Sequence, residues 1–195
     1  MSKLIPAAAF ALAFALSPAL AQSDKSSSSS SSDGTASAKS GKKLDRADQK
    51  ILRDMAESDM AEVETGKLAA SKAQSDDVKK FAQQMQDDHG KNLDEVKSLA
   101  DSKGAKLPSS PSMKHKAAAK KLESASGADF DKTYMAEMVK DHQEDLKKLK
   151  DASRKAKDAD VKAAADKTAS TVQGHLKMAQ DIASGLGASQ GSSSK

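Results

Sequence analysis

Four long segments of the chain repeat apolar residues every three to four positions, and this periodicity constrains the fold more than any other feature. Such spacing places the apolar side chains on one face of an α-helix. It predicts long helices over residues 45–73, 76–102, 128–155 and 158–184, the first of them capped by Asp45. A shorter basic helix is expected at 112–124, in a connection that contains Gly104 and Pro108.

The connections indicate how these helices are arranged. Short turns near residues 75 and 157 predict two antiparallel hairpins, and a longer crossover joins the second long helix to the third. The expected fold class is therefore all-α, a ferritin-like four-helix bundle whose crossover carries the short helix. Gly66 lies on the inner face of the first helix, where we expect another backbone to approach closely.

Composition limits both the core and the chemistry. Hydrophobic residues make up 37% of the chain and aromatic residues 3%, so the core must come mainly from Ala, Leu, Val and Met. The absence of cysteine excludes disulfides, thiolate metal sites and cysteine nucleophiles. A formal charge of +4 is small beside 31% charged residues, and the basic stretch 114–121 has no interleaved aromatic residues. Nucleic acid is therefore not an expected partner.

Residues 1–21 have the pattern of a secretory signal peptide. Lys3 precedes an apolar run, and the segment ends in the small-residue sequence Ala19-Leu20-Ala21. Pro6 interrupts the run, which is too short for a membrane-spanning helix. We expect cleavage after Ala21, secretion across the inner membrane to the periplasm or cell envelope, and no integral membrane segment in the mature chain.

Two further segments have little apolar surface. Residues 22–43 are rich in serine, and residues 187–195 are small and polar. Chains of this kind cannot bury enough apolar area to offset the entropy lost on ordering. We predict a disordered linker and a disordered tail on either side of one folded domain at residues 44–186.

Polar side chains interrupt the apolar stripes at one depth of the predicted bundle. Counting from the turns places Glu62, His89, His142 and His175 on the inner faces of four different helices, within about one helical turn of one another. Buried imidazoles need either mutual hydrogen bonds or a bound ion. Neutral imidazole with a carboxylate suits one transition-metal ion, namely Zn, Fe, Mn or Cu. The acids expected to assist as ligands or hydrogen-bond partners are Asp59, Asp88, Asp141 and Asp145.

Other residues near this layer allow two interpretations. Three methionines lie one helical turn from the interior histidines, where thioethers would suit Cu(I) or would simply fill the core. His115 lies between two lysines of the short basic helix, and we expect it on the solvated surface. The methionines are Met85, Met138 and Met178.

Four sequence segments together resemble one bacterial family. The segments MAEVETGKLA, VKKFAQQMQDDH, GADFDKTYMAEMVKDH and GHLKMA are similar to domain-of-unknown-function family 4142, which is often described as an outer-membrane family and grouped with ferritin-like proteins. The resemblance implies an exported helical bundle of unassigned activity. The matching positions are Glu62, Gly66, Phe81, His89, Phe130, Asp131, Tyr134, His142 and His175.

Kinship with ferritin-like proteins does not by itself predict a di-iron enzyme. Those centres use Glu-x-x-His pairs, and the residues three positions before His89, His142 and His175 are not glutamates. The sequence favours an exported bundle that binds one metal ion through the histidine layer. The alternative is a non-catalytic envelope stress or interaction protein in which the same histidines form a hydrogen-bond network. An enzyme is the weakest hypothesis, and contact of the basic stretch with anionic envelope surfaces stays open.

Overall fold

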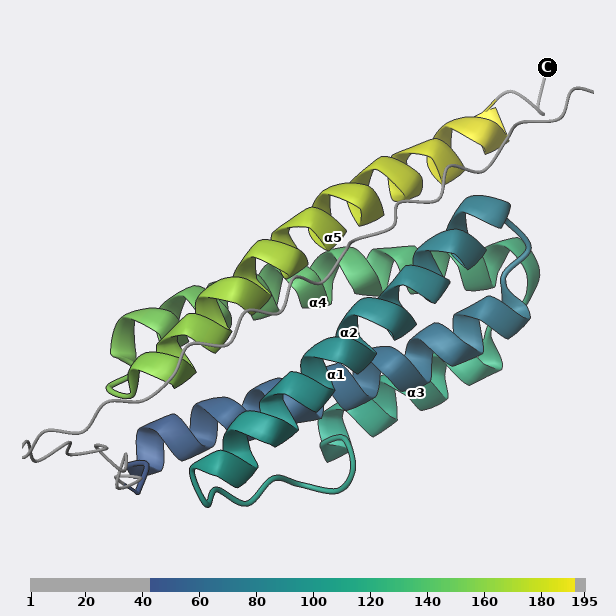
Figure 1. Ribbon diagram of the computed structural model, residues 1–195. Coiled ribbons are helices and arrows are strands. Elements are labelled where there is room, and N and C mark those ends of the chain that lie inside the picture. Colours follow the sequence, from purple (N-terminus) through teal and green to yellow (C-terminus); the bar gives the residue numbers. More distant parts are fainter. Residues whose placement is uncertain (1–42, 192–195) are drawn as a thin grey trace, which may run out of the picture. The chain divides into compact units, whose positions relative to one another are not determined.

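The computed structural model describes residues 43–191 of the chain, and side chains up to residue 187. This part is entirely helical, with α1 (Arg46–Lys72), α2 (Asp76–Ser102), α3 (Met113–Ser124), α4 (Gly127–Lys155) and α5 (Ala159–Gly191) (Figure 1). The predicted all-α class is confirmed for these residues. The predicted cleavable segment and nearly all of the predicted linker lie outside the described residues.

The helices pack as two hairpins. The most extensive contacts are those of α1 with α2 and of α4 with α5, while α2 and α5 join one hairpin to the other. The short helix α3 lies in the crossover and contacts α1 and α4. Local signals set the ends: Asp45 accepts a hydrogen bond from the Asp48 backbone N–H at 2.8 Å, and Ser112 caps α3.

One predicted boundary differs from the structure. The last helix continues to Gly191, beyond the expected end at residue 184 and into the predicted disordered tail of residues 187–195; residues 192–195 lie outside the described residues. The extension, residues 185–191, contains three glycines, one alanine and no proline. Each glycine costs about 1 kcal/mol in a helix relative to alanine, so local propensity disfavours the extension, whereas Leu186, which packs against an apolar cluster of the bundle, favours it.

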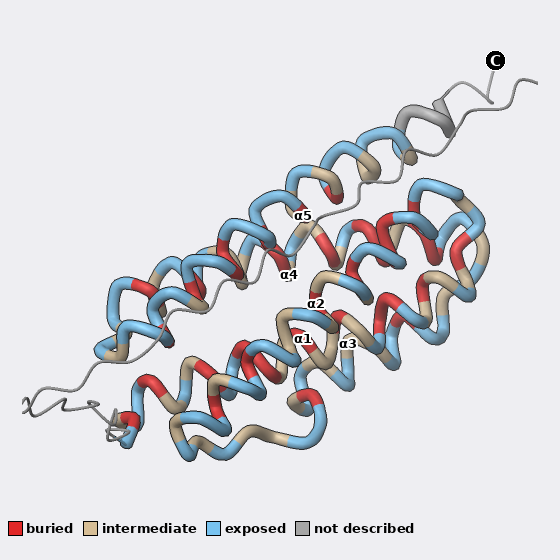
Figure 2. The backbone as a smooth tube through the Cα atoms, viewed as in Figure 1, coloured by how far each residue is buried: buried red, intermediate tan, exposed pale blue. Residues whose placement is uncertain are grey.

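Buried residues recur along one side of each long helix, as Figure 2 shows. They form two apolar clusters. One contains Phe81, Met85, Phe130 and Tyr134, and the other is built around Leu52, Val96 and Val161. Gly66 is buried where a Cβ atom would lie 3.0 Å from the Ala82 carbonyl oxygen, so the predicted close approach of a backbone is confirmed.

Two buried aspartates hold the hairpins together reciprocally. Asp48 of α1 accepts hydrogen bonds from the backbone N–H groups of Lys157 and Asp158, in the turn between α4 and α5. Asp131 of α4 accepts them from Gln74 and Ser75, in the turn between α1 and α2.

Asp131 follows Asp48 by the same number of residues as Lys157 follows Gln74 and as Asp158 follows Ser75. The two hairpins therefore repeat one arrangement. The same spacing separates Asp59 from His142, Glu62 from Asp145 and Asn92 from His175. Polar residues of the interior thus occupy corresponding places in both hairpins.

Candidate metal centre

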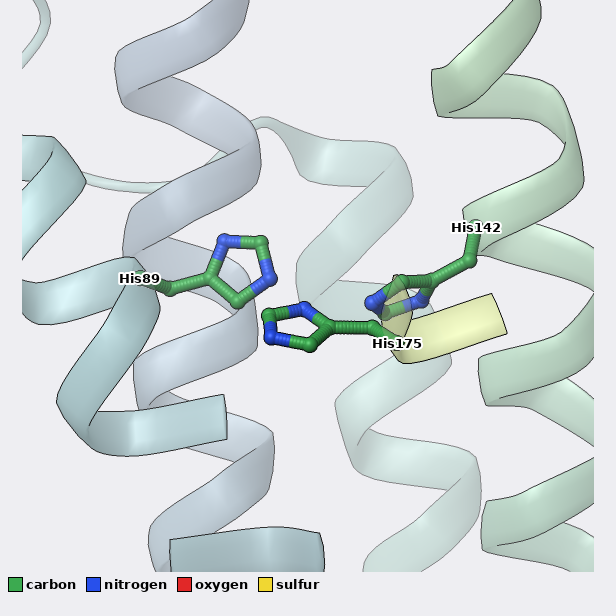
Figure 3. Close-up of side chains that lie close together, drawn as sticks. All are labelled: His89, His142 and His175. Atoms are coloured by element: carbon green, nitrogen blue, oxygen red, sulfur yellow. The ribbon is translucent and has the colours of Figure 1, made fainter. Parts of the chain in front are cut away.

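Three imidazoles meet between the two hairpins. His89 comes from α2, His142 from α4 and His175 from α5, and their side chains lie together in Figure 3. Ring centroids are 5.8 Å apart for His89 and His142, 5.3 Å for His89 and His175, and 5.6 Å for His142 and His175. One nitrogen from each ring lies within 4.8 Å of the others. The three residues are only 4%, 2% and 0% exposed, so water is largely excluded.

A buried carboxylate orients His89. The Nδ1 atom of His89 lies 2.8 Å from Asp59 Oδ1, while Asn92 donates to Asp59 Oδ2 at 2.7 Å. The Thr168 hydroxyl lies 2.9 Å from the Asn92 side-chain oxygen and thereby links α5 to this group. An ionised Asp59 can only accept, so Nδ1 carries the proton and Nε2 of His89 offers a lone pair.

A carboxylate also orients His175, but it contacts the Nε2 atom of the ring and not Nδ1. The Nε2 atom of His175 lies 2.8 Å from Asp88 Oδ2, and Gln84 donates to the same oxygen at 3.3 Å. The Nδ1 atom of His175 therefore offers the lone pair. Histidines that bind metals usually donate their other ring N–H to a carboxylate or carbonyl, which fixes the tautomer and raises the basicity of the ligand.

The other two residues of the layer, His142 and Glu62, lack the hydrogen-bond partners that His89 and His175 have. Neither ring nitrogen of His142 has a hydrogen-bond partner within residues 43–187, and the Oε2 atom of Glu62 has none either. His142 Nδ1 lies 3.9 Å from Glu62 Oε1, beyond hydrogen-bond distance. Because unsatisfied buried polar atoms are costly, these groups are the ones that most need a further partner.

Burial and neighbouring charges shift the pKa values of this group. Burial raises the pKa of Glu62 to about 7, and it lowers the pKa of His142 to about 3 with the help of the nearby His89 and His175 rings. Burial also lowers the pKa of His89, but the hydrogen bond to Asp59 and the carboxylate charges outweigh it, so the net shift is upward. His142 is consequently neutral at pH 7 and able to act as a ligand.

All four residues predicted for the layer lie in it. Of the four acids expected to assist, Asp59 and Asp88 contact histidines directly. Asp145 instead accepts hydrogen bonds from Ser58 and Lys148. Asp141 shares a small cavity with Glu62. The three methionines lie within or against one apolar cluster, which favours the interpretation as core residues.

The predicted surface position of His115 is wrong in one respect. His115 is only half-exposed, and its Nδ1 atom is shielded from solvent with no partner among the described side chains. The flanking lysines gave the opposite expectation because charge pattern alone does not show which face of a short helix meets the bundle. Thr168 lies on the predicted inner face of its helix, but its hydrogen bond to Asn92 was not predicted. Asn92 and Ser58 were not predicted as parts of the polar interior, although Asn92 follows His89 by three positions and so shares its helix face.

Three cavities among the described residues adjoin the layer. A cavity of about 280 Å³ is lined by Asp59 and His89 and by apolar residues that include Met55, Leu149 and Val172. A second, of only about 20 Å³, is lined by Glu62, Asp141, Asp145 and His115. A third cavity, of about 110 Å³, lies between α2 and α5 and is lined by Asp88 and His89. The layer is thus buried but flanked by cavities on more than one side.

Fold and site define a helical bundle with a buried three-histidine cluster. The chain belongs to the family described as Domain of unknown function (DUF4142), whose model matches residues 33–182. The predicted family is therefore confirmed.

A crystal structure of a DUF305 fragment from Deinococcus radiodurans is similar in fold, with a TM-score of 0.62 and 13% sequence identity. The similarity covers 75% of this chain and 99% of that one. No curated protein matches the sequence. Within residues 43–191, none of the helices has the length and apolar character needed to cross a membrane.

Proposed function

We propose that the protein binds one transition-metal ion through His89 Nε2, His175 Nδ1 and a nitrogen of His142, with Glu62 close enough to supply a carboxylate oxygen. The observation that carries the proposal is the pairing of two histidines with carboxylates through their outer nitrogens, which leaves the inner nitrogens unpartnered beside a third, unpartnered ring. Hydrogen bonding of this kind is typical of metal-binding histidines.

The ligand set favours divalent ions of intermediate softness. Three neutral imidazoles and one carboxylate suit Zn²⁺, Fe²⁺, Mn²⁺ or Cu²⁺. The present nitrogen separations of up to 4.8 Å exceed the roughly 3.4 Å spacing of two ligands in a tetrahedral zinc site with bonds of about 2.0–2.1 Å. Rotation of the imidazole rings would therefore accompany binding, and a partly protonated Glu62 would release its proton.

A purely structural role for the histidines is the competing hypothesis. In a non-catalytic envelope stress or interaction protein, the rings would hydrogen-bond with one another. Among the described residues, however, His142 makes no such bond, and the inner nitrogens of His89 and His175 have none. This arrangement supports an ion more than a hydrogen-bond network.

We further propose that the described domain works as an exported, ferritin-like four-helix bundle after removal of residues 1–21. The apolar run and the small-residue ending of that segment support export to the periplasm or envelope. The two hairpins and the long connection that contains α3 support the ferritin-like connectivity.

Metal content and thermal unfolding test the proposed function. Residues 22–195 would be purified without metal and then incubated separately with Zn²⁺, Cu²⁺, Fe²⁺ and Mn²⁺. At least one ion should remain bound at one per chain after dialysis and raise the unfolding temperature. The variant His142→Ala should lose both effects. If none of the ions is retained and none stabilises the protein, the proposal is wrong.

A further inference from the structure

The small cavity beside the histidine layer is large enough for only one small molecule or ion. Its volume of about 20 Å³ is close to that needed for one water molecule. Glu62 lines it; this residue is 5% exposed, and its Oε2 atom has no partner among the described residues. The cavity therefore offers one buried, unused acceptor to one small polar species.

Charge favours a cation in this cavity. Its titratable residues besides His115 are five acids and two lysines, and both lysines are already engaged: Lys114 with Glu144 at 3.1 Å and Lys148 with Asp145 at 2.8 Å. Glu137, also in the wall, is paired with Lys121 from outside the cavity. Glu62 and Asp141 have no lysine partner, and Asp145, although paired with Lys148, is the acid that lines both the small and the larger cavity.

His115 lines both the small cavity and the larger one. It shares the small cavity with Asp145 and Glu62, and the larger one with Asp145, Asp59 and His89. The larger cavity also includes exposed groups such as Lys114, so its walls extend to the surface. All four histidines of the chain thus belong either to the buried layer or to the cavities beside it.

We infer that His115 and Asp145 form an outer cation-binding position, from which a divalent transition-metal ion passes along Glu62 to His142. The inference rests on the proposed function. His115 contributes a neutral nitrogen, and Asp145 and Glu62 contribute carboxylate oxygens that have lone pairs beyond those used in their present hydrogen bonds. Each step exchanges one protein ligand for the next, so the ion is not left bare in the apolar core.

Stopped-flow measurement of Co²⁺ uptake tests the inference. Visible absorption of the bound Co²⁺ reports the inner site. The variant His115→Ala should slow uptake about tenfold, because it removes the nitrogen ligand that helps to concentrate the cation at the entrance, and a higher local cation concentration raises the association rate; the final spectrum and affinity should stay those of the unmodified protein. Lys120→Ala removes an exposed charge from the same helix and should leave the rate unchanged.

Two further variants keep the test decisive. Asp145→Asn preserves the shape of the side chain and should also slow uptake, which guards against a folding defect peculiar to His115→Ala. Equal rates for His115→Ala and Lys120→Ala would overturn the inference, as would loss of the bound spectrum in His115→Ala. His142→Ala should abolish the spectrum altogether; if that variant keeps it, the proposed function fails, whatever His115 does to the rate.

Discussion

The Nδ1 atom of His89 and the Oδ1 atom of Asp59 lie 2.8 Å apart, and both side chains are almost completely buried. This bond fixes which nitrogen of His89 faces the other two rings. A carboxylate in this role strengthens a metal ligand without touching the metal.

Asp59→Asn should therefore weaken metal binding while leaving the three imidazoles in place. We expect the dissociation constant, measured by calorimetric titration, to rise about 10- to 100-fold. Asp94→Asn, an exposed position on α2, is the matched control and should bind like the unmodified protein. Unchanged affinity in Asp59→Asn would show that the Asp59–His89 pair does not support a metal ligand.

The metal-free protein should respond differently to loss of His142 and of His89. His142→Leu removes a ring whose nitrogens have no partner within residues 43–187, so its free energy of unfolding should change by no more than about 1 kcal/mol. His89→Leu leaves Asp59 buried without its ring partner and should cost about 3 kcal/mol. Urea unfolding in the presence of a chelator measures both, and a larger loss for His142→Leu would contradict the geometry.

The raised pKa of Glu62 predicts that the unfolding free energy of the metal-free protein depends on pH. Burial raises the pKa of Glu62 to about 7 from 4.5, so the folded state holds the proton more tightly than the unfolded state. The stabilising effect of that proton is complete below about pH 4.5 and is lost as the pH rises through about 7. The difference in unfolding free energy between the unmodified protein and Glu62→Gln should fall by about 3 kcal/mol over this window.

The exposed Glu64 on the same helix offers the control for that comparison, because Glu64→Gln changes a carboxylate outside the bundle. Its difference from the unmodified protein should stay nearly constant across the window. A constant difference for Glu62→Gln as well would mean that Glu62 is not desolvated in solution.

The reciprocal contacts of Asp48 and Asp131 predict matched effects on stability. Each aspartate binds two backbone N–H groups of the opposite hairpin's turn. Replacement of either by alanine should cost about 2 kcal/mol, since the turn N–H groups lose their acceptor. The contacts lie at opposite ends of the bundle, so the two losses should add in the double variant. Marked non-additivity in thermal or urea unfolding would argue against independent contacts.

The sequence predicts the helices well because the stripes of apolar residues are long and regular. It also predicts the inner face of His89, His142 and His175, since a residue's face follows from its position in such a stripe. The sequence does not predict the contacts of Asp48 and Asp131 with the turns of the opposite hairpins. Each is a single polar residue, and its partners lie more than fifty positions away along the chain. Nothing in one sequence pairs residues at that separation.

His115 shows the same limit at the site. A twelve-residue helix with weak amphipathic character gives little indication of the face it turns inward, and the lysines around His115 pointed to solvent. Tertiary contacts of α3 with α1 and α4 decide its orientation. The Asn92–Thr168 bond likewise depends on how α2 and α5 meet, which periodicity does not specify.

X-ray diffraction from crystals grown with Zn²⁺, with data collected at the zinc absorption edge, tests metal binding most directly. We predict one anomalous peak between the three rings, about 2.0–2.1 Å from His89 Nε2 and His175 Nδ1 and bonded to His142. Crystals in which the three rings surround no anomalous peak, while zinc occupies only surface positions, would contradict the account.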